Sequence, residues 1–282
     1  MWAIHQVYNT LVEIDSNLNI VPSLARSWDI DAARTTYTFH LRTDVYFHDN
    51  DIFPDGKGRK MQADDVVFSL NRIIDKTTAS SGAWIFNNRV DSLQPFTALN
   101  DSTFQLKLLR PFHPIMGILS MQYCSIVPRE AVEKYGKDFR RNPIGTGPFT
   151  FVSWDEGEAL VMHKNKHYWE TDTAGNALPY LDAIQVSFFD NKATEFLQFR
   201  QGKLSFVNDI DPSFKDELLT KKGTLRKEWE GKLKLNKTAY LNTEYFGILV
   251  DEKNPLVQTS PTKLKLVRQA MNYAINRPQL MM

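Results

Sequence analysis

The sequence predicts an α/β protein with mixed sheets, and three observations carry that prediction. Segments with the alternating apolar pattern of strands and segments with the wider apolar spacing of helices follow one another irregularly along the chain. That irregular order favours sheets covered by helices over a repeat array or a barrel. With 282 residues, the chain exceeds the usual size of one domain, so two compact units are expected.

The first strands are expected between Thr36 and Asp49. Apolar and polar residues alternate there, which is typical of half-buried strands, and Thr43-Asp44 would form a tight turn between two of them. The apolar positions of this pattern are Tyr37, Phe39, Leu41, Val45 and Phe47. A polar loop rich in Gly, Pro and Asp should follow from Asp49 to Lys60.

Further elements are predicted by the same patterns. Ala63 to Ile74 has a helical apolar stripe, with Asp64 near the positive end of the helix dipole. The other helices are expected at 128–135, closed by Gly136, at 193–201, closed by Gly202, and at 260–275, begun by Ser260 and Pro261. The other strands are expected at 103–108, in a hairpin across 149–162, and at 184–188, 204–207 and 245–250.

Composition excludes several classes of function. A formal net charge of +1 gives no electrostatic reason to expect nucleic acid or an anionic membrane surface as a partner. The longest apolar runs are far shorter than the roughly 20 residues of a membrane-spanning helix. Cys124 is the only cysteine, so the chain can form neither an internal disulfide nor a cysteine-based metal cluster.

Candidate catalytic and metal motifs are incomplete. His163 and His167 have the spacing of metal ligands on a helix, but their segment continues a strand pattern. The glycine-rich run 145–148 has proline where a phosphate-binding helix would begin. Cys124 has apolar neighbours, which favours a buried, inert thiol. The loop from Asp49 to Lys60 lacks the final Glu of a calcium loop. We predict no catalytic site, no metal site and no cofactor.

Both ends of the chain are abrupt. An apolar pattern begins at Ile4 with almost nothing before it, and Gln279 to Met282 has the character of the start of another element. Natural domains usually taper into polar residues. We therefore expect the natural protein to extend further, with an export signal upstream and about one more domain downstream.

Several segments, taken in order, resemble one family. They are Val7–Val12, Pro22–Trp28, Tyr37–Arg42 with Val45–Asp49, Ala63–Arg72, Gly145–Phe149 with Trp154, Asn165–Trp169 and Val267–Arg277. Each motif is weak alone, but their order and spacing resemble the family 5 solute-binding proteins, the dipeptide- and oligopeptide-binding proteins of ABC importers. One departure is the loop after His48, which residues 50–59 enlarge.

The resemblance implies a periplasmic binding protein-like fold of class II, cluster C type, with two lobes that close on a ligand. By that resemblance, 1–35 and 145–255 would form domain I, and 36–144 an inserted domain II. Residues 256–282 would only begin a truncated second lobe. The chain would thus supply the first lobe.

The resemblance also implies a function that is not enzymatic. The protein would capture peptides outside the cytoplasm, in the periplasm or on the cell surface, and deliver them to the permease subunits and ATPase of an ABC transporter. It would act as a monomer and contact the membrane only through the permease or a lipid anchor outside this sequence. Alternative ligands are an oligosaccharide, a nickel chelate or haem. A ligand-free interaction module and a hydrolase are the competing classes.

The residues expected to bind the ligand follow from position in the family pattern. They are Tyr8, Asn9, Thr10, Trp84, Gly145, Thr146 and Gly147. Simple turn chemistry is the alternative for Asn9 and Thr10, core packing for Trp84, and a structural crossing between domains for the two glycines. The remaining aromatic residues of the motifs are assigned to the core: Trp28, Trp154, Tyr168 and Trp169.

Overall fold

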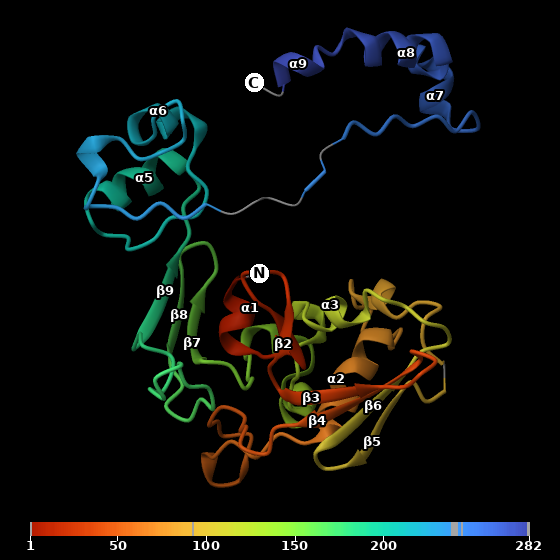
Figure 1. Cartoon of the computed structure of the whole chain (residues 1–282), viewed down its shortest axis with the longest axis vertical. Coiled ribbons are helices and arrows are strands. Elements are labelled where there is room, and N and C mark those ends of the chain that lie inside the picture. The colour runs from red at the N-terminus through yellow and green to blue at the C-terminus, as the bar shows by residue number, and fades with distance from the viewer. Residues whose placement is uncertain (1, 92, 238–241, 244, 281–282) are drawn as a thin grey trace. The chain divides into compact units, whose positions relative to one another are not determined.

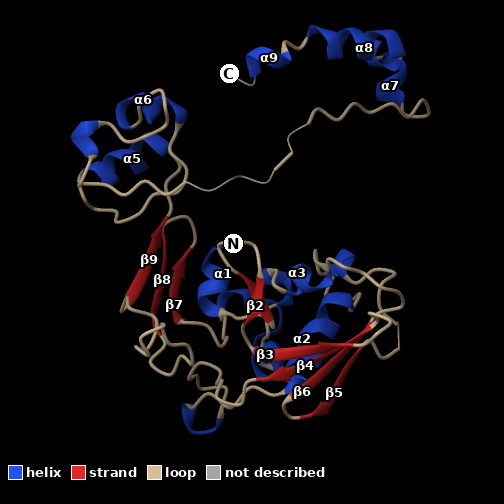
Figure 2. Cartoon of the chain, in the orientation of Figure 1, coloured by secondary structure: helices blue, strands red, loops and turns tan. Residues whose placement is uncertain are grey.

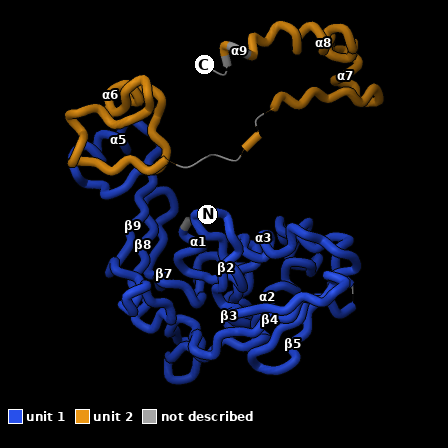
Figure 3. The backbone as a smooth tube through the Cα atoms, in the orientation of Figure 1, with its two compact units in different colours: residues 1–207 blue, residues 208–282 orange. Residues whose placement is uncertain are grey.

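A computed structural model describes residues 2–91, 93–237, 242–243 and 245–280 (Figure 1). The chain forms two compact units, residues 1–207 and 208–282, which Figure 3 colours separately. Two units are what the length predicts. The boundaries expected at 35, 144 and 255 belong to a finer division, which stays a prediction. In the described part of the chain, no helix is both long and apolar enough to cross a bilayer.

The largest sheet of the first unit has the strand order β3-β4-β6-β5, and every neighbouring pair in it is antiparallel. The strands are β3 (Ala25–Ile30), β4 (Thr36–Leu41), β6 (Thr103–Lys107) and β5 (Phe96–Asn100). The predicted strands at 36–41 and 103–108 are therefore confirmed, and β4 lies between β3 and β6.

Two smaller antiparallel sheets complete this unit. One pairs β1 (Val12–Ile14) with β2 (Ile20–Pro22), and the other has the order β7-β8-β9. The strands of the second are β7 (Phe149–Asp155), β8 (Ala159–Lys164) and β9 (Ala183–Ser187). This confirms the predicted hairpin, whose turn contains Gly157 at a φ of 87°, and the predicted strand at 184–188.

The helices are distributed over both units (Figure 2). The first unit contains α1 (Trp2–Val7), α2 (Ala63–Ile74), α3 (Ile115–Leu119), α4 (Arg129–Tyr135) and α5 (Lys192–Arg200). The second contains α6 (Lys215–Leu218), α7 (Pro255–Thr259), α8 (Lys265–Ala274) and α9 (Arg277–Leu280). The helices predicted at 63–74, 128–135 and 193–201 are confirmed.

The main core lies between α2 and the four-stranded sheet (Figure 1). Val66, Leu70 and Ile73 face it from α2, as the helical stripe predicts. From the sheet come Phe39 and Phe104, whose ring centroids are 5.9 Å apart. Burying a side chain of this size contributes roughly 1.5–3 kcal/mol, so this layer accounts for much of the stability of the unit.

Several predictions about the second half of the chain were wrong. Residues 204–207 and 245–250 form no strand, and the helix expected from Ser260 begins only at Lys265. Ser260 does start a turn, because its hydroxyl accepts a hydrogen bond from the Thr262 N–H. Of the element expected at 279–282, residues 279 and 280 are the end of α9, and residues 281 and 282 lie outside the described ones. An apolar run becomes a strand only where another strand completes its hydrogen bonds.

Two further assignments need correction. Trp154 is 36% exposed on β7 and is not a core residue, whereas Trp28 and Trp169 do pack against the core. Val45 and Phe47 are buried as predicted, but their segment does not form a hairpin with β4. It runs antiparallel to residues 59–61 instead, through hydrogen bonds from Phe47 N–H to the Arg59 carbonyl and from Met61 N–H to the Val45 carbonyl.

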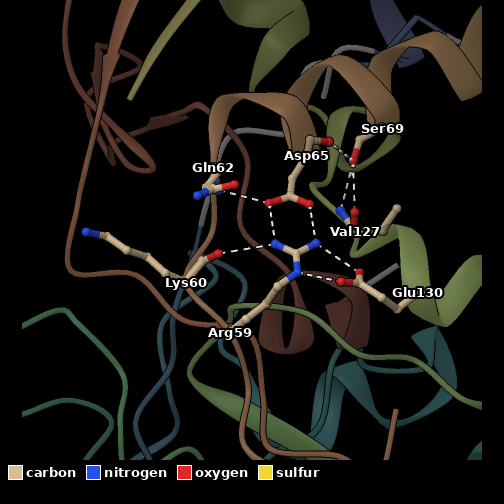
Figure 4. Close-up of polar contacts among 7 residues, drawn as sticks. All are labelled: Arg59, Lys60, Gln62, Asp65, Ser69, Val127 and Glu130. Atoms are coloured by element: carbon tan, nitrogen blue, oxygen red, sulfur yellow. Dashed lines mark hydrogen bonds and ion pairs between the residues drawn. The ribbon is translucent and has the colours of Figure 1, made fainter. Parts of the chain in front are cut away.

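Arg59 closes the enlarged loop onto two helices (Figure 4). Its guanidinium donates to both oxygens of Asp65 on α2, at 2.7 and 2.9 Å, and to both oxygens of Glu130 on α4, at 2.5 and 2.9 Å. Asp65 also accepts from the Gln62 N–H and so caps α2. Such paired, charge-assisted bonds are stronger than neutral ones and fix geometry.

The charges of this cluster depend on one another. The Asp65 side chain is buried, so its charge requires Arg59. The hydrogen bond from Arg59 lowers the pKa of Glu130 below its ordinary value of 4.5. Because the folded-state pKa is lowered, this contribution to stability is present above pH 4.5 and is lost as the pH falls through the folded value.

We expect Arg59→Gln to lower the free energy of unfolding by about 3 kcal/mol at neutral pH, because it leaves the buried Asp65 carboxylate without its positively charged partner. Urea unfolding at about pH 7 and about pH 3.5 measures this effect, and the loss should be smaller at the acidic pH. Arg26→Gln is the matched control, since Arg26 is exposed on β3. Equal effects of the two substitutions would contradict the role given to Arg59.

Candidate functional site

Six of the seven residues expected to bind ligand lie together in the first unit. Tyr8, Asn9 and Thr10 form the short connection between α1 and β1, and Gly145, Thr146 and Gly147 precede β7. The two segments meet at a backbone hydrogen bond of 2.9 Å from the Gly147 N–H to the Val7 carbonyl. We call this meeting point the crossing, made of residues 7–10 and 145–148.

Both glycines are required by the closeness of the two backbones. A Cβ atom at Gly145 would lie 2.1 Å from the Val7 carbonyl oxygen, and one at Gly147 would lie 2.5 Å from the Val7 carbonyl carbon. No side chain fits at such distances without a shift of the main chain. The predicted structural role of these glycines, a crossing between two segments, therefore has a direct steric cause: only glycine fits at either position.

His48 joins the crossing from a third segment. Its Nε2 lies 2.9 Å from the Gly147 carbonyl oxygen, and its Nδ1 accepts from the Gly145 N–H at 3.4 Å. Its own N–H donates to the Gly145 carbonyl at 2.8 Å. These partners require the neutral ring with the proton on Nε2. Burial lowers the pKa of His48 to about 4, although the Gly147 hydrogen bond and the Asp49 charge act in the opposite direction.

The Asn9 side chain connects the two segments of the crossing to a fourth segment. Thr146 Oγ1 donates to Asn9 Oδ1 at 3.1 Å, and Asn9 Nδ2 donates to the Tyr168 hydroxyl at 3.3 Å. Asn165, three residues before Tyr168, donates to the Gly147 carbonyl at 3.0 Å. Asn9 is 4% exposed and Thr146 is 1% exposed, so their polar atoms depend on these bonds.

Tyr8 and Thr10 flank Asn9 in different surroundings. The Thr10 hydroxyl donates to the Val12 carbonyl at 2.8 Å, and the Thr10 carbonyl accepts from the Leu24 N–H. Burial raises the pKa of the Tyr8 phenol, against the hydrogen bond from Ile144 and the positive charge of Arg72. Tyr8 therefore stays a neutral phenol that can donate or accept a hydrogen bond.

Trp84 is the seventh expected residue and lies on a different element. It belongs to a short 3₁₀ turn, Ala83–Ile85, that follows α2, and 48% of its surface is exposed. Arg89 donates to the Trp84 carbonyl at 2.7 Å and so holds the backbone of this turn. Gly82, just before it, leaves room for the ring of Tyr123. An exposed indole on a firmly held turn suits contact with a ligand.

Three residues that bond to the crossing were not among the predicted site residues, namely His48, Asn165 and Tyr168. All three stand inside motifs that carry the family resemblance. His48 was quoted without a role and Tyr168 was assigned to the core. These residues could have been predicted from the glycines of the crossing. Backbone groups that become buried where two segments approach closely need partners, and polar side chains in the nearby motifs can supply them.

The arrangement offers hydrogen bonds and aromatic surface for binding. Cys124 is buried, as expected, and burial raises the pKa of its thiol to about 12, so it stays protonated at neutral pH. His163 lies on β8, so its spacing from His167 does not place both on one helix face. Across residues 2–280, apart from the undescribed positions, no three His, Cys, Asp or Glu side chains gather as a metal site would require.

Comparison with known proteins identifies relatives over almost the whole chain. The model of the bacterial extracellular solute-binding proteins, family 5, matches residues 19–282. Heme-binding protein A of Haemophilus influenzae is 30% identical over 96% of this chain, and the dipeptide-binding protein of Escherichia coli K12 is 28% identical over 96%. These alignments cover 48% and 49% of the two relatives, so the chain spans about half of their length.

Solved structures agree with the sequence matches. The periplasmic binding protein DppA of Helicobacter pylori, in complex with the peptide STSA, superposes with a TM-score of 0.65 and 31% identity. That match covers 76% of this chain and 43% of the other. NikZ of Campylobacter jejuni, in complex with Ni(L-His), gives a TM-score of 0.59 and 27% identity over 71% of this chain and 37% of its own. The predicted fold class is thereby confirmed.

Acid should weaken the crossing through His48. The lowered pKa means that its contribution is complete above the ordinary value of 6.5 and is lost as the pH falls toward 4. We expect the free energy of unfolding to fall by about 3 kcal/mol over this window. His48→Gln should flatten that part of the pH profile, measured by urea unfolding, whereas His5→Gln on the surface of α1 should not. A profile unchanged by His48→Gln would refute this assignment.

Gly147→Ala should destabilise the first unit by about 1–3 kcal/mol, the usual range for overpacking, because the added methyl group meets the backbone of Val7. Gly117→Ala on α3 is the control, since a Cβ added at Gly117 would have open space within 4 Å around it. Thermal unfolding of both variants measures the difference. If the Gly147→Ala protein is as stable as the control, the main chain at the crossing can shift to accommodate the methyl group at little cost.

Proposed function

The chain belongs to family 5 of the bacterial extracellular solute-binding proteins, and from this premise we propose that it captures peptides outside the cytoplasm for an ABC importer. The observation that carries the choice of peptide is the 31% identity to the Helicobacter pylori protein bound to a tetrapeptide. The proposal includes delivery of the peptide to permease subunits coupled to an ATPase. Solute binding without catalysis is part of it.

We propose that the seven expected residues form the part of the ligand site that lies on this chain. Trp84 is half exposed and would contact the ligand with its aromatic face, whereas Tyr8 is partly buried and would present only the outer part of its ring. Thr10 and Thr146 are nearly enclosed, so they would act chiefly by holding the connection between α1 and β1 in place. Asn9 is also nearly enclosed, and it would add one amide hydrogen that Tyr168 does not take up. Gly145 and Gly147 would allow that connection to lie close to residues 145–147, because they have no side chain.

The domain arrangement is proposed on the same basis. Domain I would consist of 1–35 and 145–255, with domain II, 36–144, inserted and 256–282 leading into a second lobe. Clefts that enclose a ligand bury most of its surface, so a ligand held by one lobe alone would be bound weakly. We also propose a monomer in the periplasm or at the outer face of the membrane, anchored by a lipid.

A non-peptide ligand is the second candidate. The 30% identity to a haem-binding protein supports haem, and the likeness to a structure holding nickel and histidine supports a nickel chelate. An oligosaccharide would use the exposed aromatic surface. One fold carries many ligands, because the side chains of the cleft decide which solute fits.

The tetrapeptide Ser-Thr-Ser-Ala tests the proposal, with calorimetry on the complete gene product and on the 282-residue chain. We expect binding by the former, and at least about a hundredfold weaker binding by the latter, because several hydrogen bonds at about 0.5–1.5 kcal/mol each would be missing. Trp84→Ala should weaken binding about tenfold, and Trp154→Ala, the matched exposed indole, should not.

Haem and Ni(II)-histidine are the competing probes in the same measurement. Neither should displace the tetrapeptide. Binding of haem or nickel-histidine with no binding of the tetrapeptide would replace the peptide proposal by the second candidate. Equal peptide affinity of the two polypeptides would contradict the two-lobe arrangement.

A further inference from the structure

We propose that Glu170, acting through Tyr168, orients the Asn9 amide so that the site presents a hydrogen-bond donor there and takes a carbonyl oxygen of the ligand. Tyr168 and Glu170 are then positioning residues. The assignment of a ligand carbonyl rests on the proposed function, whereas the orientation of the amide rests on the structure alone.

A continuous series of hydrogen bonds connects the four side chains. Thr146 Oγ1 donates to Asn9 Oδ1 at 3.1 Å, Asn9 Nδ2 donates to Tyr168 Oη at 3.3 Å, and Tyr168 Oη donates to Glu170 Oε2 at 2.9 Å. These residues come from the crossing and from the segment directly after β8. We call this series the Asn9 relay.

The direction of the relay follows from proton counting. The Tyr168 hydroxyl donates its single hydrogen to Glu170 Oε2, and a carboxylate has no hydrogen to donate in return. The phenol oxygen can then only accept, and the group that faces it must be the NH₂ of Asn9. The oxygen and nitrogen of an amide are ordinarily hard to distinguish, but here the carboxylate at the end of the relay decides between them.

Burial keeps the relay in this state. Asn9 and Thr146 are almost completely enclosed, and an unpaired buried polar group costs about 1–3 kcal/mol. Burial also raises the pKa of the Tyr168 phenol, which the bond from Asn9 offsets only in part, so the proton that Glu170 accepts stays on the ring oxygen.

One donor of the relay remains unused. The Asn9 nitrogen carries two hydrogens, and among the described residues Tyr168 is the only acceptor that it reaches. The second hydrogen can be given to a carbonyl oxygen, the acceptor that every peptide unit carries. With the amide reversed, the same position would present an oxygen and select an N–H group instead.

Asn9→Asp tests the direction of the relay, because it keeps the shape of the side chain and replaces the NH₂ by an acceptor. The new carboxylate would face a phenol oxygen whose hydrogen is already donated to Glu170, so we expect a lower Tm. Adding Glu170→Gln should recover at least about half of that loss. The amide that this second substitution introduces can donate to the phenol oxygen through its NH₂, and the phenol can then donate to position 9.

Glu13→Gln is the matched control for simple relief of charge. Glu13 also acts on Tyr168 electrostatically, but its carboxylate accepts from the Ser23 hydroxyl and not from the phenol. Asn9→Asp with Glu13→Gln should therefore recover much less Tm than Asn9→Asp with Glu170→Gln. Equal recovery in the two double variants, or none with Glu170→Gln, would overturn the proposal.

A measurement on the unaltered protein covers the case in which no double variant folds. With ¹⁵N-labelled asparagine, the Asn9 NH₂ hydrogens should show nuclear Overhauser effects to the Tyr168 ring, and effects to the Thr146 methyl group alone would mean the reverse orientation. Neither experiment contains peptide. Failure of peptide capture would thus leave the orientation standing, and a reversed amide would not refute peptide capture.

Discussion

The approach of the Val7 carbonyl to Gly145 and Gly147 leaves no room for a side chain, and the connections from α1 to β1 and into β7 both depend on that contact. Two segments far apart in the sequence are joined there by the main-chain hydrogen bond from the Gly147 N–H to the Val7 carbonyl, and His48 bonds to both glycines. Backbone groups enclosed in this way cannot turn to water. The crossing therefore forms as a whole, and it holds the connection between α1 and β1 in a single path.

A second, charged cluster, formed by Arg59, Asp65 and Glu130, lies at the other end of the loop that follows His48. His48 is followed by the enlarged loop, and Arg59 at the far end of that loop binds Asp65 and Glu130. The crossing and this cluster use opposite chemistry. His48 must be neutral to make its bonds, whereas Arg59 and its carboxylates must be charged, so both contribute most when the pH is above the range in which His48 and Glu130 take up protons.

The fold constrains the kind of site more than the identity of the ligand. Relatives of this chain are named for haem, dipeptide and glutathione, and they are about twice as long as this chain. Under the proposed function, the present chain would contribute an exposed indole, Trp84, and a buried amide, Asn9, whose direction is set by neighbouring groups. An amide held by its neighbours suits recognition, because groups held in advance lose little entropy on binding.

The sequence by itself determined the elements that depend on local pattern. The bounds of α2 and the hairpin of β7 and β8 follow from apolar periodicity and turn residues, which act over a few positions. The family pattern also predicted seven ligand residues, of which six lie close together at the crossing. Only the tertiary structure decided that Val45 pairs with Met61, that Trp154 is exposed, and that the Tyr168 hydroxyl accepts a hydrogen bond from Asn9. Such partners come from distant segments, and no local periodicity encodes which segment will supply the missing hydrogen bond.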